Sequence, residues 1–362
     1  MTRPARALID VAALRHNLSR VRALAPASRV FAIVKANGYG HGLARVGRSL
    51  QEADGFGVAC LEEALALREA SIPQRILLLG GVFDPSELPL VDQHRLDVVV
   101  HDESQVEFLE RARLQRPISV WLKIDTGMHR LGVHPASVPR LWQRLVECAN
   151  VARPIRVLSH LANADRPQEQ QTGSQLSCLL ACAGGLATEI SVANSAAILT
   201  RPESHRDWVR PGIMLYGISP FPDAQGTQYD LQPAMTLMTQ LIAVRRVAEG
   251  ETIGYGGTWR CPQAMPVGVA AIGYGDGYPR HAPSGTAVLV NGKRVPLIGR
   301  VSMDLITLDL SSQPHARPGD PVVLWGRGLP IEELAQRAGT IAYELVCRVA
   351  SRVRFTEGHE RV

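Results

Sequence analysis

The sequence predicts an α/β fold joined to a β fold: an N-terminal TIM-like (β/α)8 barrel followed by a C-terminal all-β domain. Between residue 30 and about residue 210, short apolar runs alternate with longer amphipathic segments, which is typical of parallel βα units. The apolar runs number eight, and eight parallel strands close a barrel. After about residue 217 the chain changes to short β-like segments. An open, doubly wound sheet is the alternative for the first part.

The predicted barrel strands are residues 30–34, 56–59, 75–79, 97–100, 119–124, 156–160, 190–193 and 208–210. Segments between them, such as 61–70 and 103–114, repeat apolar residues at i, i+3 and i+4. This spacing predicts amphipathic helices packed against the strands.

Residues 218–232 are rich in proline, glycine and polar residues and predict a linker. Six β segments follow, at 235–244, 267–272, 287–290, 295–298, 305–310 and 322–324. Asn291-Gly292 predicts a tight hairpin, because both central turn positions favour positive φ. We therefore expect domains at residues 1–225 and 226–362, with the extreme N-terminus able to pack with the β domain.

Composition excludes several function classes. The net charge of +5 is spread along the 362 residues rather than gathered in a basic block, so we expect no nucleic-acid partner. No apolar run approaches the roughly 20 residues of a membrane-spanning helix, and no apolar stretch follows the basic N-terminus, so we expect a cytoplasmic protein. The six cysteines form no CxxC pair, so no metal site is predicted.

Lysine occurs only three times, at Lys35, Lys123 and Lys293. Chemistry that needs a neutral amine, such as Schiff-base formation, is restricted to these residues, because arginine keeps its proton. Lys35 ends the first predicted strand and precedes a glycine-rich turn. Strand ends of this kind face the active site of a barrel, where an apolar setting makes an amine more nucleophilic. A solvated lysine at a strand end is the alternative.

Other polar residues also follow predicted strands. Lys123 and Asp125 share one face of the fifth strand and could form a structural ion pair. His160 ends the sixth strand and could be structural. Ser195 could cap a helix or bind phosphate. Residues 213–217 could form a short helix with its N–H groups towards a phosphate, or 213–216 could be the eighth strand.

The run KANGYGHG at residues 35–42 resembles the pyridoxal-phosphate signature of the alanine racemase family, with Gly38 where that family usually has alanine. Further motifs follow in the family's order: KIDTGMHRLG at 123–132, RPGI at 210–213, IGYGGT at 253–258, GYGDGY at 273–278 and GRVSMD at 299–304. The resemblance covers essentially the whole chain.

The resemblance implies pyridoxal 5′-phosphate as the cofactor. Lys35 is then the lysine that holds the cofactor, and Tyr39 bonds its phosphate. Gly212 and Ile213 are also assigned to the phosphate, as Ser195 could be. Arg210 is assigned to the pyridine nitrogen, and His160 links towards the cofactor and the catalytic tyrosine.

The resemblance also assigns the substrate side. Tyr255 is the second catalytic acid/base, opposite Lys35, and Arg130 and the N–H of Met303 contact the substrate carboxylate. Tyr274 helps to form the substrate entrance. Lys123 aligns with a lysine that carries a carbamate in some members. Ser351 stands where some members have a phosphate-binding tyrosine, so that contact is in doubt.

The function so implied is that of an alanine racemase, interconverting L-alanine and D-alanine by a two-base mechanism through an external aldimine. The substrate is a small amino acid, and family sites are completed across a homodimer. The alternatives are a racemase of broader specificity, a barrel-type pyridoxal-phosphate decarboxylase and a non-catalytic pyridoxal-phosphate-binding protein.

Overall fold

The computed structural model describes residues 3–166, 168–186 and 188–358. The chain divides into two compact units. One comprises Arg15–Leu215 and contains the barrel. The other combines Met1–Leu14 with Tyr216–Val362 and contains the antiparallel sheet.

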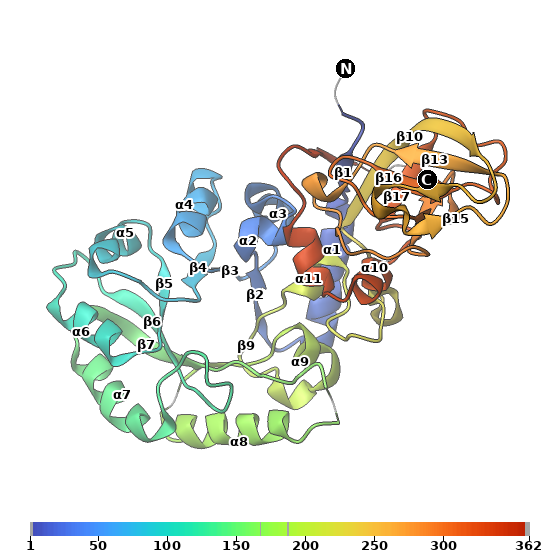
Figure 1. Ribbon diagram of the computed structural model, residues 1–362. Helices are drawn as coiled ribbons and strands as arrows, with labels where there is room; N and C mark the ends of the chain where they lie inside the picture. The colour runs from blue at the N-terminus through green and yellow to red at the C-terminus, as the bar shows by residue number, and fades with distance from the viewer. Residues whose placement is uncertain (1–2, 167, 187, 359–362) are drawn as a thin grey trace. The chain divides into compact units, whose positions relative to one another are not determined.

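The predicted barrel is confirmed (Figure 1). Its strands are parallel, and each pairs with the next along the chain. Pairing of the last strand with the first closes the ring and excludes the open sheet. The strands are β2 (Arg29–Ile33), β3 (Gly55–Val58), β4 (Arg75–Leu78), β5 (Asp97–Val100), β6 (Ile118–Lys123), β7 (Val151–Leu158), β8 (Ile190–Ser191) and β9 (Trp208–Val209).

Amphipathic helices lie outside the strands, as their spacing predicts (Figure 1). In α7, for example, the buried residues Val138, Leu141 and Leu145 are spaced by three and four, so they share one helix face. The helices are α1 (Val11–Leu24), α3 (Leu43–Ser49), α4 (Leu61–Glu69), α5 (Leu88–Gln93), α6 (Glu103–Arg111), α7 (Val138–Glu147), α8 (Gln171–Ala183) and α9 (Ser195–Thr200).

Aromatic rings and ion pairs fill the amino-terminal end of the barrel. The Phe31 ring stacks on Trp208 at a centroid distance of 4.2 Å and meets Trp121 edge-on at 5.5 Å. Asp97 accepts hydrogen bonds from Arg75 and from the Trp121 indole. Side chains therefore fill this end of the barrel, and we expect the active site at the opposite, carboxyl-terminal end.

The second unit is built on one eight-stranded sheet. Its long central strand, β10, pairs with β1, β13 and β17. All pairs are antiparallel except β1 with β18. The strands are β1 (Arg6–Ile9), β10 (Met235–Val247), β13 (Met265–Ala270), β14 (Ala287–Val290), β15 (Lys293–Ile298), β16 (Ile306–Asp309), β17 (Pro321–Trp325) and β18 (Arg354–Glu357), and β11 (Thr252–Ile253) pairs separately with β12 (Trp259–Arg260).

The boundary between the units differs from the expected one. Residues 218–232 are not a free linker, because the N–H groups of Ser219 and Gly226 donate to the Glu332 carboxylate at 2.9 and 3.0 Å. The barrel unit therefore ends at Leu215 rather than at residue 225. Strand β1 takes the start of the chain into the sheet of the second unit.

The hairpin between β14 and β15 is confirmed. Asn291 and Gly292 have φ angles of 50° and 75°, which are the positive values that a two-residue turn of this type needs. The second unit also contains two helices that the sequence pattern had not indicated, α10 (Ile331–Ala338) and α11 (Ala342–Cys347). Among the residues described, no helix has the length and apolar character needed to cross a membrane.

Candidate active site at the carboxyl end of the barrel

Lys35 lies two residues beyond the end of β2 and opens the segment labelled α2 (Lys35–Tyr39) in Figure 1. This segment is a left-handed turn, since the φ angles of Ala36, Asn37, Gly38 and Tyr39 are 54°, 55°, 63° and 49°. Such angles are unfavourable for residues with a Cβ atom. Gly38, which differs from the alanine usual in the resembling family, is the residue that adopts them at least cost.

Tyr39 and Ser195 meet at Gly212. A Cβ atom on Gly212 would lie 2.7 Å from the Tyr39 hydroxyl, which is too close for a Cβ atom. Glycine at this position therefore leaves room for the Tyr39 hydroxyl. The Ser195 hydroxyl accepts a hydrogen bond from the Gly212 N–H at 2.9 Å. The 3-10 helix η4 (Ile213–Tyr216) starts at this point, so these residues are not an eighth strand.

Ser195 does not cap a helix through its side chain. The cap of α9 is Asn194, whose side chain accepts from the Ala197 N–H at 3.0 Å. The Ser195 hydroxyl is thereby left to face the Gly212 backbone.

Arg210 is buried and held by the strands on either side. Its Nη1 donates to the Ser191 hydroxyl at 2.7 Å, and its Nη2 donates to the Ser159 carbonyl at 2.5 Å. Nη2 also lies 3.5 Å from His160 Nδ1. Burial lowers the pKa of Arg210 to about 10, so the guanidinium stays charged at neutral pH.

Lys123 lies at the end of β6 and is almost fully buried. Burial lowers its pKa to about 8, and the charges of Arg210, Arg130 and Lys35 add to this effect. Burial and the same cations hold the pKa of His160 well below its usual range, so His160 is neutral. The structure thus brings four predicted cationic side chains within electrostatic reach of one another.

Asp125 does not serve as the ion-pair partner of Lys123. Its carboxylate accepts from the N–H groups of Gly127, Met128 and His129 at 3.0 to 3.1 Å, and its second oxygen pairs with the His129 ring at 3.0 Å. These bonds shape the loop that carries the exposed Arg130. The positive charges of the cluster outnumber the Asp125 carboxylate, and such a cluster attracts anionic ligands.

The predicted residues of the second unit lie on three adjoining loops. Tyr255 is in the loop between β11 and β12, where Gly256 approaches the Arg300 guanidinium. The Tyr274 N–H donates to the Ser302 carbonyl at 3.0 Å, next to Met303. Tyr255, Tyr274 and Met303 are 68%, 40% and 53% exposed, so three large residues on adjoining loops face solvent in the single chain.

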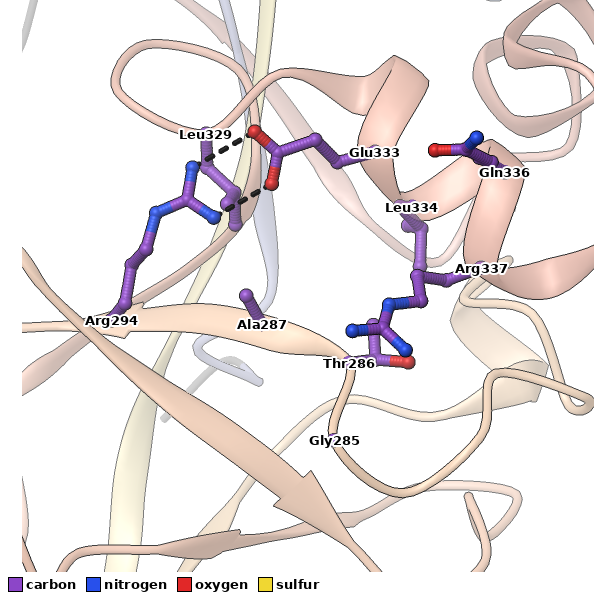
Figure 2. A pocket seen from close by; sticks show the side chains of 9 residues that line it. All are labelled: Gly285, Thr286, Ala287, Arg294, Leu329, Glu333, Leu334, Gln336 and Arg337. Atoms are coloured by element: carbon purple, nitrogen blue, oxygen red, sulfur yellow. Dashed lines mark hydrogen bonds and ion pairs between the residues drawn. The ribbon is translucent and has the colours of Figure 1, made fainter.

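A separate pocket in the second unit contains none of the predicted site residues (Figure 2). A bidentate ion pair between Arg294 and Glu333, with N···O distances of 2.6 and 2.9 Å, crosses one side of it. The charge of Arg294 is thereby compensated internally, and we assign the pocket no part in the candidate chemistry.

Two domains of one protein family together match nearly the whole chain. The alanine racemase N-terminal domain matches residues 9–220, and the alanine racemase C-terminal domain matches residues 234–356. The chain belongs to the alanine racemase family. It is 55% identical over 351 residues to the alanine racemase of Nitrosococcus oceani, covering 97% of this chain and 98% of that protein. It is 51% identical over 347 residues to the biosynthetic alanine racemase of Escherichia coli K12, covering 96% and 97%.

Solved structures of alanine racemases have the same fold. The biosynthetic alanine racemase of Pseudomonas aeruginosa superposes with a TM-score of 0.95 at 48% identity, covering 99% of this chain and all of that one (100%). The alanine racemase of Acinetobacter baumannii gives 0.91 at 38% identity, covering 99% and 100%. The likeness extends over both units.

Sequence reasoning missed several residues that support this alanine racemase site. Ser159 and Ser191 hold the Arg210 guanidinium, and buried His41 bonds the Tyr39 carbonyl through Nδ1 at 2.8 Å. Their places at the ends of strands β7 and β8 and in the KANGYGHG run were the available signals. Ser351 is exposed in the turn before β18.

Proposed function

We propose that this chain interconverts L-alanine and D-alanine with pyridoxal 5′-phosphate bound at the carboxyl end of the barrel. The observation that carries the proposal is that Lys35, Arg130 and Arg210 all lie within electrostatic reach of Lys123 in a chain of this family. A lysine amine can join the cofactor's aldehyde. The surrounding cations would balance a phosphate and a substrate carboxylate.

The residues present fit the cofactor. The Tyr39 and Ser195 hydroxyls both lie beside Gly212, so a phosphate bound there would accept hydrogen bonds from them and from the Gly212 and Ile213 N–H groups. Arg210 would face the pyridine nitrogen, and its positive charge would discourage protonation there. When bound, the cofactor supplies an electron sink that acidifies the α-hydrogen of an attached amino acid.

The chain's own residues would then move and hold the proton. Lys35 Nζ would act on one face of the substrate and Tyr255 Oη on the other, one removing the α-proton while the other donates. Arg130 would orient the substrate carboxylate with two parallel hydrogen bonds, and the Met303 N–H would add a third. Tyr274 would line the entrance, and neutral His160 would link towards Tyr255.

Tyr255, Tyr274 and Met303 would come from a second copy of the chain in a homodimer. Their exposure in this chain supports that arrangement, because large exposed apolar side chains mark surfaces that a partner covers.

Lys123 is proposed to carry a carbamate. With a pKa of about 8, about a tenth of its amine is neutral at pH 7, and the neutral form is the one that adds carbon dioxide. A carbamate would also replace a buried cation by an anion next to Arg130 and Arg210. Carbon-13 NMR of the protein in labelled bicarbonate should reveal a carbamate signal that is absent in Lys123→Met.

Racemisation in heavy water tests the proposed function. The holoenzyme is incubated separately with L-alanine, L-serine and L-lysine, and chiral analysis follows D-isomer formation and α-deuterium uptake. We expect rapid formation of deuterated D-alanine and much slower reaction of the other two. Comparable rates would indicate a broad racemase, and carbon dioxide release a decarboxylase. A Tyr255→Phe variant that racemises normally would remove Tyr255 from its role.

A further inference from the structure

The turn that follows Lys35 adopts an unfavourable conformation over five consecutive residues. Ala36 to Gly40 all have positive φ angles, between 49° and 78°. Left-handed backbone is normally confined to single residues, usually glycine. A run that includes Ala36, Asn37 and Tyr39 persists only where surrounding contacts hold it.

Bonds within the turn and to residues nearby in the sequence hold its later part. The Gly38 N–H donates to the Val34 carbonyl at 2.8 Å, and the Gly40 N–H donates to the Ala36 carbonyl at 2.9 Å. The Asn37 side chain accepts from the Leu43 N–H at 2.8 Å. The first N–H of the turn, that of Ala36, depends on a residue outside it.

That residue is Glu63. One oxygen of its carboxylate accepts from the Ala36 N–H at 2.6 Å, and the other accepts from the Ala59 N–H at 2.8 Å. Ala36 directly follows Lys35, whereas Ala59 follows β3. One side chain therefore ties together the ends of two neighbouring barrel strands.

Glu63 is the third residue of α4. A glutamate at this position commonly reaches back to the N–H of the helix cap. Here it passes the cap residue, Cys60, and bonds the preceding N–H together with the turn beside it. One of its two bonds therefore reaches the lysine segment, and the other bonds the residue before its own helix cap.

We propose that Glu63 is a positioning residue, which fixes the left-handed turn so that Lys35 is held where it captures the cofactor. The inference rests on the proposed function. Both carboxylate oxygens are needed, because a glutamine amide can accept through only one atom and would place N–H donors against the other backbone N–H. Charge-assisted bonds of this kind are also the stronger ones.

Borohydride trapping of pyridoxal phosphate on Lys35 tests the proposal. The apoprotein is titrated with the cofactor, reduced, and digested, and mass spectrometry measures the fraction of Lys35 that is labelled, with Lys293 as an internal reference. We expect Glu63→Gln to need about tenfold more cofactor for half-labelling, consistent with loss of a charged acceptor. Its kcat should fall by a similar factor while KM stays near the wild-type value.

Glu62→Gln is the matched control. It removes the same charge from the same helix turn, but Glu62 is exposed and its side chain interacts with Cys60. We expect labelling and kcat of this variant to match wild type. Glu63→Asp has a shorter side chain that cannot span both N–H groups, so its labelling and kcat should lie between those of Glu62→Gln and Glu63→Gln. Glu63→Asp replaces Glu63→Gln in the test if Glu63→Gln does not fold.

Three outcomes overturn the inference. The first is Glu63→Gln labelling and turning over like Glu62→Gln. The second is a loss of Lys35 labelling that only follows the unfolded fraction measured by circular dichroism. If wild-type Lys35 takes no cofactor, the proposed function and this inference both fail, whereas a normal wild type confines the failure to Glu63.

Discussion

At the scale of single residues, Lys123 is a buried cation whose charged form is disfavoured at the barrel mouth. Its pKa of about 8 lies below its ordinary 10.5 because burial and nearby cations disfavour the charged form. The unfolded chain therefore binds more protons than the folded one between these two values. Stability should rise with pH across this window, and the full cost should be present below pH 8.

We expect Lys123→Met to stabilise the apoprotein at pH 7 by about 1–3 kcal/mol in buffers stripped of carbon dioxide. The rise in stability between pH 8 and pH 10.5 should also become smaller, because the titrating group is gone. Urea unfolding at several pH values measures both effects. Lys293→Met, at an exposed position, should change neither, and equal pH slopes for wild type and Lys123→Met would contradict the assignment.

At the scale of secondary-structure elements, the side chains at the two ends of the barrel have different roles. The amino-terminal end joins strands through partly buried polar pairs, such as Arg75 with Asp97 at 2.6 Å, and through stacked aromatic rings. The carboxyl-terminal end gathers several positive charges that act on Lys123. Changes at the first end should affect stability, and changes at the second should affect chemistry.

Asp97→Ala should lower the free energy of unfolding by about 2–3 kcal/mol, because it leaves the Arg75 charge and the buried Trp121 indole N–H without their acceptor. Activity per folded molecule should be unchanged. Glu110→Ala, which breaks a more exposed pair with Arg144, should cost less than about 1 kcal/mol. Urea unfolding and racemisation assays distinguish the two variants, and similar losses in both would argue against a structural role for the barrel floor.

The β14–β15 hairpin permits a test of backbone conformation alone. Gly292 has a φ of 75°, and a Cβ there would touch nothing within 4 Å. Gly292→Ala should therefore cost about 1 kcal/mol through left-handed strain. In Gly173→Ala, a Cβ in helix α8 also meets nothing within 4 Å, and stability should increase slightly. Thermal unfolding of Gly292→Ala and Gly173→Ala measures the two changes in stability. A change of the same sign in both variants would contradict the prediction.

At the scale of the whole molecule, the proposed site residues fall into two sets on two units. The barrel provides Lys35 and the cationic cluster, and the second unit provides exposed Tyr255, Tyr274 and Met303. A homodimer with shared sites would give each set its complement from the other copy.

Mixing two inactive variants should restore activity if the sites are shared. In a mixed dimer of Lys35→Ala and Tyr255→Phe chains, one site has both wild-type residues and the other has neither. After random exchange of subunits, half of the dimers are mixed, so about a quarter of wild-type activity should return. Racemisation assays before and after mixing measure this. No recovery despite demonstrated exchange would place both residues of a site in one chain.

Much of the fold follows from local sequence. The eight apolar runs and the Asn291-Gly292 turn are short-range signals, because strand periodicity and turn geometry depend on neighbouring residues. Lys35, Lys123, His160 and Arg210 lie at or just beyond strand ends, and parallel strands bring their carboxyl ends to one edge. Strand position alone left structural alternatives open for Lys35, Lys123 and His160, and the family resemblance assigned the roles of all four residues.

Contacts between distant residues were decided only by the tertiary structure. The pairing of β1 with β10 and β18 joins the two ends of the chain, and no local pattern specifies such a partner. The left-handed turn after Lys35 is unfavourable by local preference, so it depends on outside contacts such as that of Glu63. The sequence alone thus predicted the barrel and most strands of the second unit, and its motifs predicted the chemistry through a family resemblance, because these signals are local. Long-range packing decided the unit boundary and the residues that hold the proposed site in place.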